Sequence, residues 1–170
     1  VHHAYTTPAE SDLAAVVYQA SIAKDTTYAG TDIGKRFRRM TMQLLYLSKQ
    51  VRPDIALATV LLTRVQAWPS PDLLKRAERI LIYVIGTKDL KLTYSASEKA
   101  ASFSWAPRVS TMDGFSDASF EIAHSTSGYV FMLANAAIDW GSKKQESIAI
   151  TTQHAEIIAG SEAACAAIGH

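Results

Sequence analysis

The spacing of apolar residues changes once along this chain, near Gly86, and this change constrains the fold more than any other feature. Before Gly86 the apolar residues recur every three to four positions, which is the period of an amphipathic helix. After Gly86 they alternate with polar residues, which is the period of a strand. The sequence therefore predicts helices first and a sheet second, within an α+β or α/β fold.

Three helices are expected before Gly86. The first is centred on residues 37–47, whose apolar members have helical spacing. Pro53 opens the second helix, at an early position where its missing N–H costs little. That helix should end near Trp68, because the residue before a proline is pushed out of the helical region. Ser70 is the N-cap of the third helix, and Gly86 is a C′ stop. Short connections favour an antiparallel helical hairpin.

The part after Gly86 reads as short strands followed by one alanine-rich helix. Strands are expected at residues 91–95, 101–105, 114–120, 128–133 and 137–143, and the helix at residues 153–168. The first 34 residues contain only one short apolar run and are expected to be irregular. The chain is thus divided into an irregular segment at 1–34, a helical segment at 35–90 and a sheet-containing segment at 91–170.

Charge is distributed unevenly over the 170 residues, although the net charge is only +1. Residues 1–110 hold 15 Lys/Arg against 9 Asp/Glu, and residues 111–170 hold 2 against 7. A basic segment beside an acidic one suits a nucleic-acid enzyme, because cations bind phosphates and carboxylates hold divalent metal. Two surfaces that are simply solvated, with no role in binding, would give the same uneven charge counts. No run of eighteen or more apolar residues appears, so no membrane partner is expected.

Three groups of cations are candidates for contacts with phosphates. The candidate residues are Lys35, Arg36, Arg38 and Arg39 in the first helix, Lys75, Arg76 and Arg79 in the third, and Lys143 and Lys144 at a strand end. Solvated surface charges have the same pattern, so both interpretations remain open.

Several phrases of the sequence occur in an order that is characteristic of one family. They are Leu44-Leu45-Tyr46-Leu47, Arg52-Pro53-Asp54-Ile55, Gly86-Thr87-Lys88-Asp89-Leu90, Gly114-Phe115-Ser116-Asp117-Ala118, Ser127-Gly128-Tyr129-Val130-Phe131, Trp140-Gly141-Ser142-Lys143-Lys144-Gln145 and Ala155-Glu156. Together they resemble copia-type (Pseudoviridae-like) retrotransposon Pol polyproteins, at the joint between reverse transcriptase and ribonuclease H. The resemblance runs from about Phe37 to Ile168.

The resemblance implies a fold and a chemistry. Residues 35–90 are similar to the helices of a reverse transcriptase thumb or connection, and residues 91–170 to the first half of a ribonuclease H-like fold, a three-stranded antiparallel sheet with one helix. Ribonuclease H cuts the RNA strand of an RNA–DNA hybrid with Mg2+, or Mn2+, held by carboxylates. Asp117 matches the first metal ligand of the family and Glu156 the second. The family's next acid lies on a strand beyond this helix, and the sequence stops at His170 before it.

The resemblance also implies partners and a location. The partners are an RNA–DNA hybrid and the rest of the Pol polyprotein, and the location is cytoplasmic virus-like particles and the nucleus. A sheet edge without its neighbouring strand favours self-association. Three functions stay open: a hydrolase module that cuts when the rest of its domain is supplied, a non-catalytic relic that binds nucleic acid or a partner, and a helical adaptor.

Overall fold

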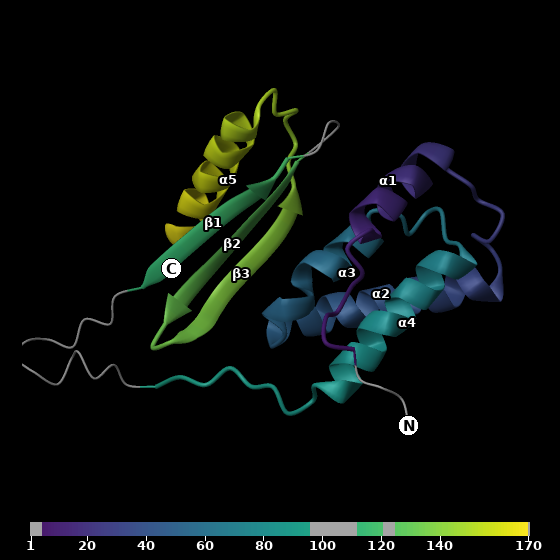
Figure 1. Ribbon diagram of the computed structural model, residues 1–170, viewed down its shortest axis with the longest axis horizontal. Coiled ribbons are helices and arrows are strands. Elements are labelled where there is room, and N and C mark those ends of the chain that lie inside the picture. The colour runs from purple at the N-terminus through teal and green to yellow at the C-terminus, as the bar shows by residue number, and fades with distance from the viewer. Residues whose placement is uncertain (1–4, 96–111, 121–124, 170) are drawn as a thin grey trace, which may run out of the picture. The chain divides into compact units, whose positions relative to one another are not determined.

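The computed structural model describes residues 5–95, 112–120 and 125–169 (Figure 1). The chain divides into two compact units, Val1–Leu90 and Lys91–His170, which we call unit 1 and unit 2. The expected strand at residues 101–105 lies outside the described residues. Each unit has its own architecture, helices in the first and a sheet with one helix in the second, which confirms the predicted α+β class.

Unit 1 is built from helices around one apolar core. Its elements are α1 (Leu13–Ala23), α2 (Asp32–Gln50), the short 3-10 helix η1 (Pro53–Ile55), α3 (Ala56–Thr63) and α4 (Pro71–Gly86). The side chain of Ser70 accepts a hydrogen bond from the Leu73 N–H at 3.2 Å, so the predicted N-cap is confirmed. The second predicted helix is shorter than expected and ends at Thr63, because the chain then tightens into turns up to Trp68.

The prediction of an irregular segment at residues 1–34 was wrong for α1. Leu13 and Val17 lie one helical turn apart and are both buried in the core of unit 1. The helix ends at Ala23, and Lys24 caps it in a left-handed conformation with φ 48°. Two buried residues are too few to give a periodic pattern, so contacts with the rest of the unit, rather than local sequence, favour this helix.

The end of α4 differs from the expected glycine stop. The helix ends at Gly86, yet no glycine among the described residues has a positive φ. Instead the Thr87 N–H donates to the Tyr83 carbonyl at 2.9 Å, and the Thr87 hydroxyl donates to the same oxygen at 2.7 Å. The Thr87 hydroxyl therefore caps α4 in place of the left-handed glycine that the sequence predicted.

Unit 2 is an antiparallel three-stranded sheet in the order β1-β2-β3, with α5 packed against β1 and β2 (Figure 1). The elements are β1 (Asp113–Ser119), β2 (Thr126–Leu133), β3 (Ala136–Lys144) and α5 (Thr152–Ala167). Thr151 caps α5 by accepting from the His154 N–H at 3.1 Å. The β2–β3 turn uses the left-handed Ala134 and Asn135. The sheet and helix predicted for this region are confirmed.

The strand predicted at residues 91–95 was wrong. These residues form no regular element, although the Ser95 N–H donates to the Ala134 carbonyl at 2.9 Å and the Tyr94 hydroxyl donates to the Ala137 carbonyl at 2.8 Å. The segment therefore touches the β2–β3 hairpin at isolated points and has no ladder of hydrogen bonds, which a strand requires.

Candidate functional site

The two candidate metal ligands come from the elements that meet in unit 2. Asp117 lies on β1 in register with Gly128 of β2, and its side chain is exposed. Glu156 lies in α5, directly after the buried Ala155, and is exposed too. One face of α5 is turned inward, because its buried residues lie four positions apart, at Ala155, Ala159 and Ala163. Glu156 lies beside that face, where a carboxylate remains open to solvent.

A buried glutamine joins the end of the sheet near Asp117 to the helix that carries Glu156. The Gln145 side chain is 1% exposed, and its Nε2 donates to the Ser127 hydroxyl at 3.0 Å and to the Ala155 carbonyl at 2.9 Å. The Gln145 N–H donates to the Ser125 carbonyl at 2.8 Å. Since Ser127 is adjacent to the register partner of Asp117, both acids belong to the same end of unit 2. Sequence reasoning missed this role, although Gln145 closes one of the family phrases.

The structure does not complete a carboxylate cluster around Asp117 and Glu156. Among the described residues no group of three or more His, Cys, Asp or Glu is arranged to hold a metal ion. Asp117 and Ser127 project from opposite faces of the sheet, because Ser127 is in register with Ala118 and neighbours alternate. Asp139 accepts from the Tyr129 hydroxyl at 3.2 Å. Burial and the nearby Asp139 raise the pKa of Tyr129.

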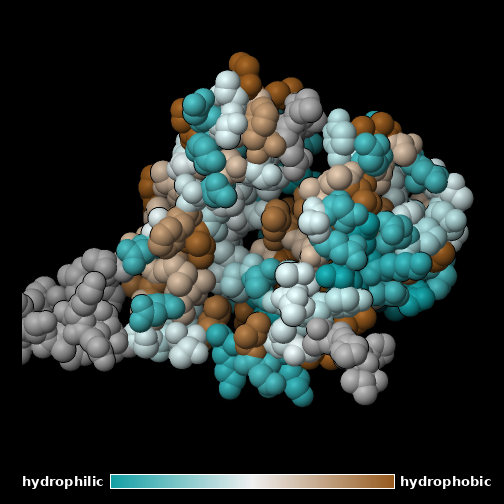
Figure 2. All heavy atoms as spheres, in the orientation of Figure 1, coloured by the Kyte–Doolittle hydropathy of each residue, from teal (hydrophilic) through white to brown (hydrophobic). Residues whose placement is uncertain are grey.

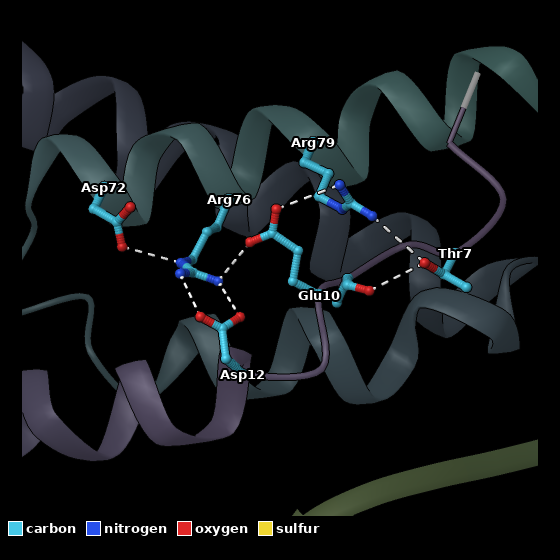
Figure 3. A network of polar contacts seen from close by, with 7 residues as sticks. Thr7, Glu10, Asp12, Asp72, Arg76 and Arg79 are labelled. Atoms are coloured by element: carbon cyan, nitrogen blue, oxygen red, sulfur yellow. Dashed lines mark hydrogen bonds and ion pairs between the residues drawn. The ribbon is translucent and has the colours of Figure 1, made fainter. Parts of the chain in front are cut away.

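Arg76, a candidate phosphate ligand, is surrounded by carboxylates of its own chain (Figure 3). Its guanidinium binds Asp12 through two hydrogen bonds of 2.8 and 3.0 Å, and it also binds Glu10 at 2.8 Å and Asp72 at 3.0 Å. Its side chain is 13% exposed. Hydrogen bonds from Arg76 lower the pKa of the Asp12 carboxyl. In this arrangement Arg76 ties the segment before α1 to α4.

Arg79 has a similar position one turn further along α4. Its Nη1 pairs with Glu10 at 3.4 Å, its Nη2 donates to the Thr7 hydroxyl at 3.5 Å, and its guanidinium carbon lies 3.9 Å from the centre of the Tyr5 ring. Cations over aromatic rings are attracted to the face of the ring. Figure 2 shows the hydrophilic surface that gathers over this part of unit 1.

The remaining candidate cations fall into two groups. Arg36 pairs with Glu78 at 3.4 Å, Arg38 donates to the Ala29 carbonyl, and Lys143 pairs with Glu146 at 3.0 Å and Glu162 at 3.8 Å. By contrast, Lys35, Arg39, Lys75 and Lys144 are exposed, and within the described part of the chain their side chains have no hydrogen bond or ion pair.

Two of these unpaired cations lie on the outer face of α2. Lys35 and Arg39 are one turn apart, on the side of the helix opposite the buried Phe37, Thr41, Leu44 and Ser48. The same side carries Tyr46, which is 70% exposed, and Lys49. This row spans about 21 Å along the helix axis. Tyr46 and Lys49 were not among the predicted binding residues, and Tyr46 entered the sequence analysis only as part of a family phrase.

These observations define a class of protein: helices followed by the first half of a ribonuclease H-like fold, with one acid on the first strand and one on the helix. Comparison with known proteins finds relatives among transposon proteins. The chain is 32% identical to a transposon Ty5-1 protein of Saccharomyces cerevisiae over 127 residues, which are 74% of this chain and 39% of the relative. It is 30% identical over 123 residues to the retrovirus-related Pol polyprotein from transposon TNT 1-94 of Nicotiana tabacum, covering 70% of this chain and 8% of that protein.

The chain belongs to the family of copia-type retrotransposon Pol polyproteins. It is also 32% identical over 124 residues to Secreted RxLR effector protein 161 of Plasmopara viticola, covering 71% of this chain and 80% of that protein. No protein-family model and no solved structure matches the chain. Within the described residues no helix is both long and apolar enough to span a bilayer. The chain spans about two fifths of the length of the yeast relative and less than a tenth of the tobacco polyprotein.

Proposed function

We propose that this chain supplies half of a ribonuclease H site, which hydrolyses the RNA strand of RNA–DNA hybrids. The observation that carries the proposal is the Gln145 bridge, which links Ser127, next to the register partner of Asp117, to the helix of Glu156. Asp117 and Glu156 belong to the same end of unit 2, but Asp117 projects from the sheet face opposite Ser127, so further carboxylates are required before the two acids can share a metal site.

The donor set fits a hard divalent cation. Asp117 and Glu156 are exposed carboxylates and offer oxygen ligands, which suit Mg2+, or Mn2+, better than soft metals. Such ions, when bound, stabilise negative charge on a phosphodiester and activate water. Asp117 and Glu156 would hold the divalent cations at this end of unit 2. Two carboxylates leave most coordination positions of a pair of ions open, so the rest of the Pol polyprotein is the partner that supplies the missing acids.

The proposed contacts with the substrate are made by exposed cations of unit 1. Lys35, Arg39 and Lys75 are exposed and, within the described ranges, have no internal partner. An RNA–DNA hybrid carries phosphates that these groups neutralise with release of counterions. Tyr46 adds an exposed ring that stacks on bases at a frayed end or a single strand. By resemblance to its family, the proposed locations of the chain are the cytoplasmic virus-like particle and the nucleus.

The test is a cleavage assay with two proteins. The 170-residue chain should leave a labelled RNA–DNA hybrid intact in Mg2+ or Mn2+. A chimera that continues into the segment following the matched region of the tobacco polyprotein should cut it, and Asp117→Asn or Glu156→Gln should abolish cutting in the chimera. Glu146→Gln is the matched control, because Glu146 is an exposed acid of the same unit that pairs with Lys143. Cleavage by the chimera that survives Asp117→Asn contradicts the proposal.

A second candidate function is binding of nucleic acid without hydrolysis, as in a degenerate relic. The unpaired cations of α2 favour it, because they do not depend on the carboxylate site. A hybrid that binds to the chimera and is never cut selects this candidate.

Self-association through the sheet edge is a further proposal. In the described sheet β1 pairs with β2 alone, and all but one of its seven residues are exposed, including Phe115. An exposed strand edge pairs readily with another strand. Sedimentation should show concentration-dependent dimers, and Phe115→Lys should remove them. A chain that stays monomeric at high concentration contradicts this proposal.

A further inference from the structure

The segment from Tyr5 to Asp12, which we call the N-terminal strap, lies across the arginines of α4 (Figure 3). Glu10 and Asp12 of the strap bind Arg76, and Glu10 and Thr7 bind Arg79. The strap joins positions that are 64 to 72 residues apart in sequence. Two of the three cations that face away from the core on α4 are therefore occupied by the chain itself.

The carboxylates of the strap bind the arginines of α4 in the way that a phosphate group would bind them. Asp12 presents both carboxylate oxygens to one guanidinium, at 2.8 and 3.0 Å, in the fork-to-fork geometry that arginine also uses for a phosphodiester. The three carboxylates of Glu10, Asp12 and Asp72 exceed the two guanidinium charges. A phosphate that approaches Arg76 meets net negative charge while the strap is in place.

We propose that the N-terminal strap is an internal competitor of nucleic acid: its carboxylates occupy Arg76 and Arg79, and a hybrid backbone displaces them. The inference rests on the proposed function, because it assumes that unit 1 binds a hybrid. The strap thus occupies two arginines of α4, the helix that also carries the exposed Lys75.

The strap can leave without unfolding the unit. Its residues are exposed except for the half-buried Pro8 and Ala9, whereas the anchors of α1, Leu13 and Val17, are buried. Exposed carboxylates contribute little net stability through ion pairs, because water and salt screen them. A polyphosphate backbone presents many charges at once and gains from counterion release, so it competes well for the same guanidinium groups.

The experiment measures hybrid affinity across a salt series by fluorescence anisotropy. Glu10→Gln with Asp12→Asn removes the competing charge and keeps side-chain size. The double variant should bind a 20-base-pair RNA–DNA hybrid about tenfold more tightly at low salt, and two added phosphate contacts should steepen the slope of log K against log salt by about 1.8. The matched control is Asp25→Asn with Asp89→Asn, which removes the same charge from exposed positions of unit 1 away from the strap contacts.

The outcomes separate this inference from the proposed function. If neither the parent nor any variant binds the hybrid, the proposed hybrid contact and the masking both fail. If the parent binds but the strap variant gains no more than the control variant, the masking alone is overturned. Adding Arg76→Gln and Arg79→Gln to the strap variant should remove the gain in affinity and in slope; a gain that persists is explained by general charge and overturns the masking.

A measurement on the unaltered chain keeps the test independent of variant folding. The Leu13 N–H donates to the Glu10 carbonyl at 3.2 Å, so its exchange with solvent reports on the strap. Saturating hybrid should accelerate exchange of the Leu13 amide and leave the Leu74 amide, which donates to Ser70 at 3.0 Å, unchanged. Unchanged exchange at Leu13 in the bound protein overturns the proposal.

Discussion

The Nη2 of Arg52 donates to the Thr87 hydroxyl at 2.7 Å, which joins the phrase before α3 to the end of α4 across 35 residues of sequence. The same guanidinium donates to the Thr87 carbonyl at 3.3 Å and binds the Asp54 carboxylate at 2.9 and 2.7 Å. It also lies 5.5 Å from the centre of the Tyr83 ring. Two phrases that marked the family in the sequence are therefore parts of one partly buried contact in unit 1.

Arg52→Ala should lower the free energy of unfolding of unit 1 by about 3 kcal/mol, because the Asp54 carboxylate and the Thr87 carbonyl both lose the guanidinium donor and Asp54 keeps only Tyr83 as a side-chain hydrogen-bond partner. The Arg52 side chain is 8% exposed and that of Asp54 30%, so solvent replaces the lost contacts only in part. Arg52→Lys keeps the charge but not the planar fork and should recover less than half of the loss. Amide exchange of α4 under increasing urea measures both variants. A lysine variant as stable as the parent contradicts the importance of the fork.

Glycine to alanine substitutions at two helical positions should have opposite effects. At Gly160 in α5 a Cβ meets nothing within 4 Å, so alanine should stabilise unit 2 by about 1 kcal/mol through helix propensity. At Gly34 in α2 a Cβ would overlap the Tyr28 carbonyl oxygen and lie 2.9 Å from that of Ala29, so alanine should destabilise unit 1 by about 3 kcal/mol. Urea unfolding followed by circular dichroism and amide exchange measures the two signs. Equal effects at the two sites rule out close packing at Gly34.

Gln145→Ala should destabilise unit 2 by about 2 kcal/mol, because the buried Ser127 hydroxyl and the Ala155 carbonyl both lose a donor. In the cleaving chimera the same change should lower kcat more than hybrid affinity, since it loosens the helix of Glu156 and leaves the cations of unit 1 intact. Gln153→Ala, at an exposed position of α5, is the control and should change the stability by less than about 0.5 kcal/mol.

Acid should weaken unit 1 through Asp54 and Asp12. Burial alone would raise the pKa of Asp54, but hydrogen bonds from Arg52 hold it below its ordinary value of 3.8; hydrogen bonds from Arg76 likewise lower the pKa of Asp12. A carboxyl with a lowered folded-state pKa contributes stability that is fully present above 3.8 and is lost as the pH falls through the lower value. The urea midpoint of unit 1 should therefore fall below about pH 4. Asp54→Asn should flatten this dependence, whereas Asp89→Asn should not; an identical pH profile in Asp54→Asn contradicts the assignment.

Lys35→Gln with Arg39→Gln should reduce the salt dependence of hybrid binding. Two lost phosphate contacts lower the magnitude of the slope of log K against log salt by about 1.8. Lys88→Gln with Lys91→Gln, which removes equal charge elsewhere in the chain, should leave the slope closer to that of the parent. Equal slopes for the two double variants place the contact elsewhere. The assay also shows whether Tyr46→Ala weakens binding to single strands more than to hybrids, as stacking requires.

Local signals predicted much of this fold. Ser70 capped its helix as expected, because a serine followed by proline and an acid satisfies the first turn without help from the rest of the protein. The turn at Ala134 and Asn135 joined the two strands on either side of it as the alternation required. By contrast, α1 depends on two residues that find their partners across the unit.

The candidate site was less accessible to sequence reasoning. Asp117 and Glu156 could be named because family phrases surround them, whereas their link through Gln145 is a three-dimensional contact between a loop, a strand and a helix. Arg76 and Arg79 were grouped with Lys75 by helical spacing alone. Spacing says nothing about a strap some 64 residues upstream, and so it could not distinguish cations with internal partners from those without.

In the sheet that the structure describes, β1 lies at an edge, so a strand that pairs with it makes the stability of unit 2 depend on the concentration of that strand. A peptide that extends the sheet along β1 binds the folded unit and not the unfolded one, so each increase in its concentration stabilises the fold. Folding of unit 2 and capture of a strand are thus coupled equilibria, and neither has a fixed free energy apart from the other. If unit 2 is fused to one protein and a peptide that pairs with β1 is fused to another, the thermal midpoint of unit 2 should rise when the two proteins come close to each other.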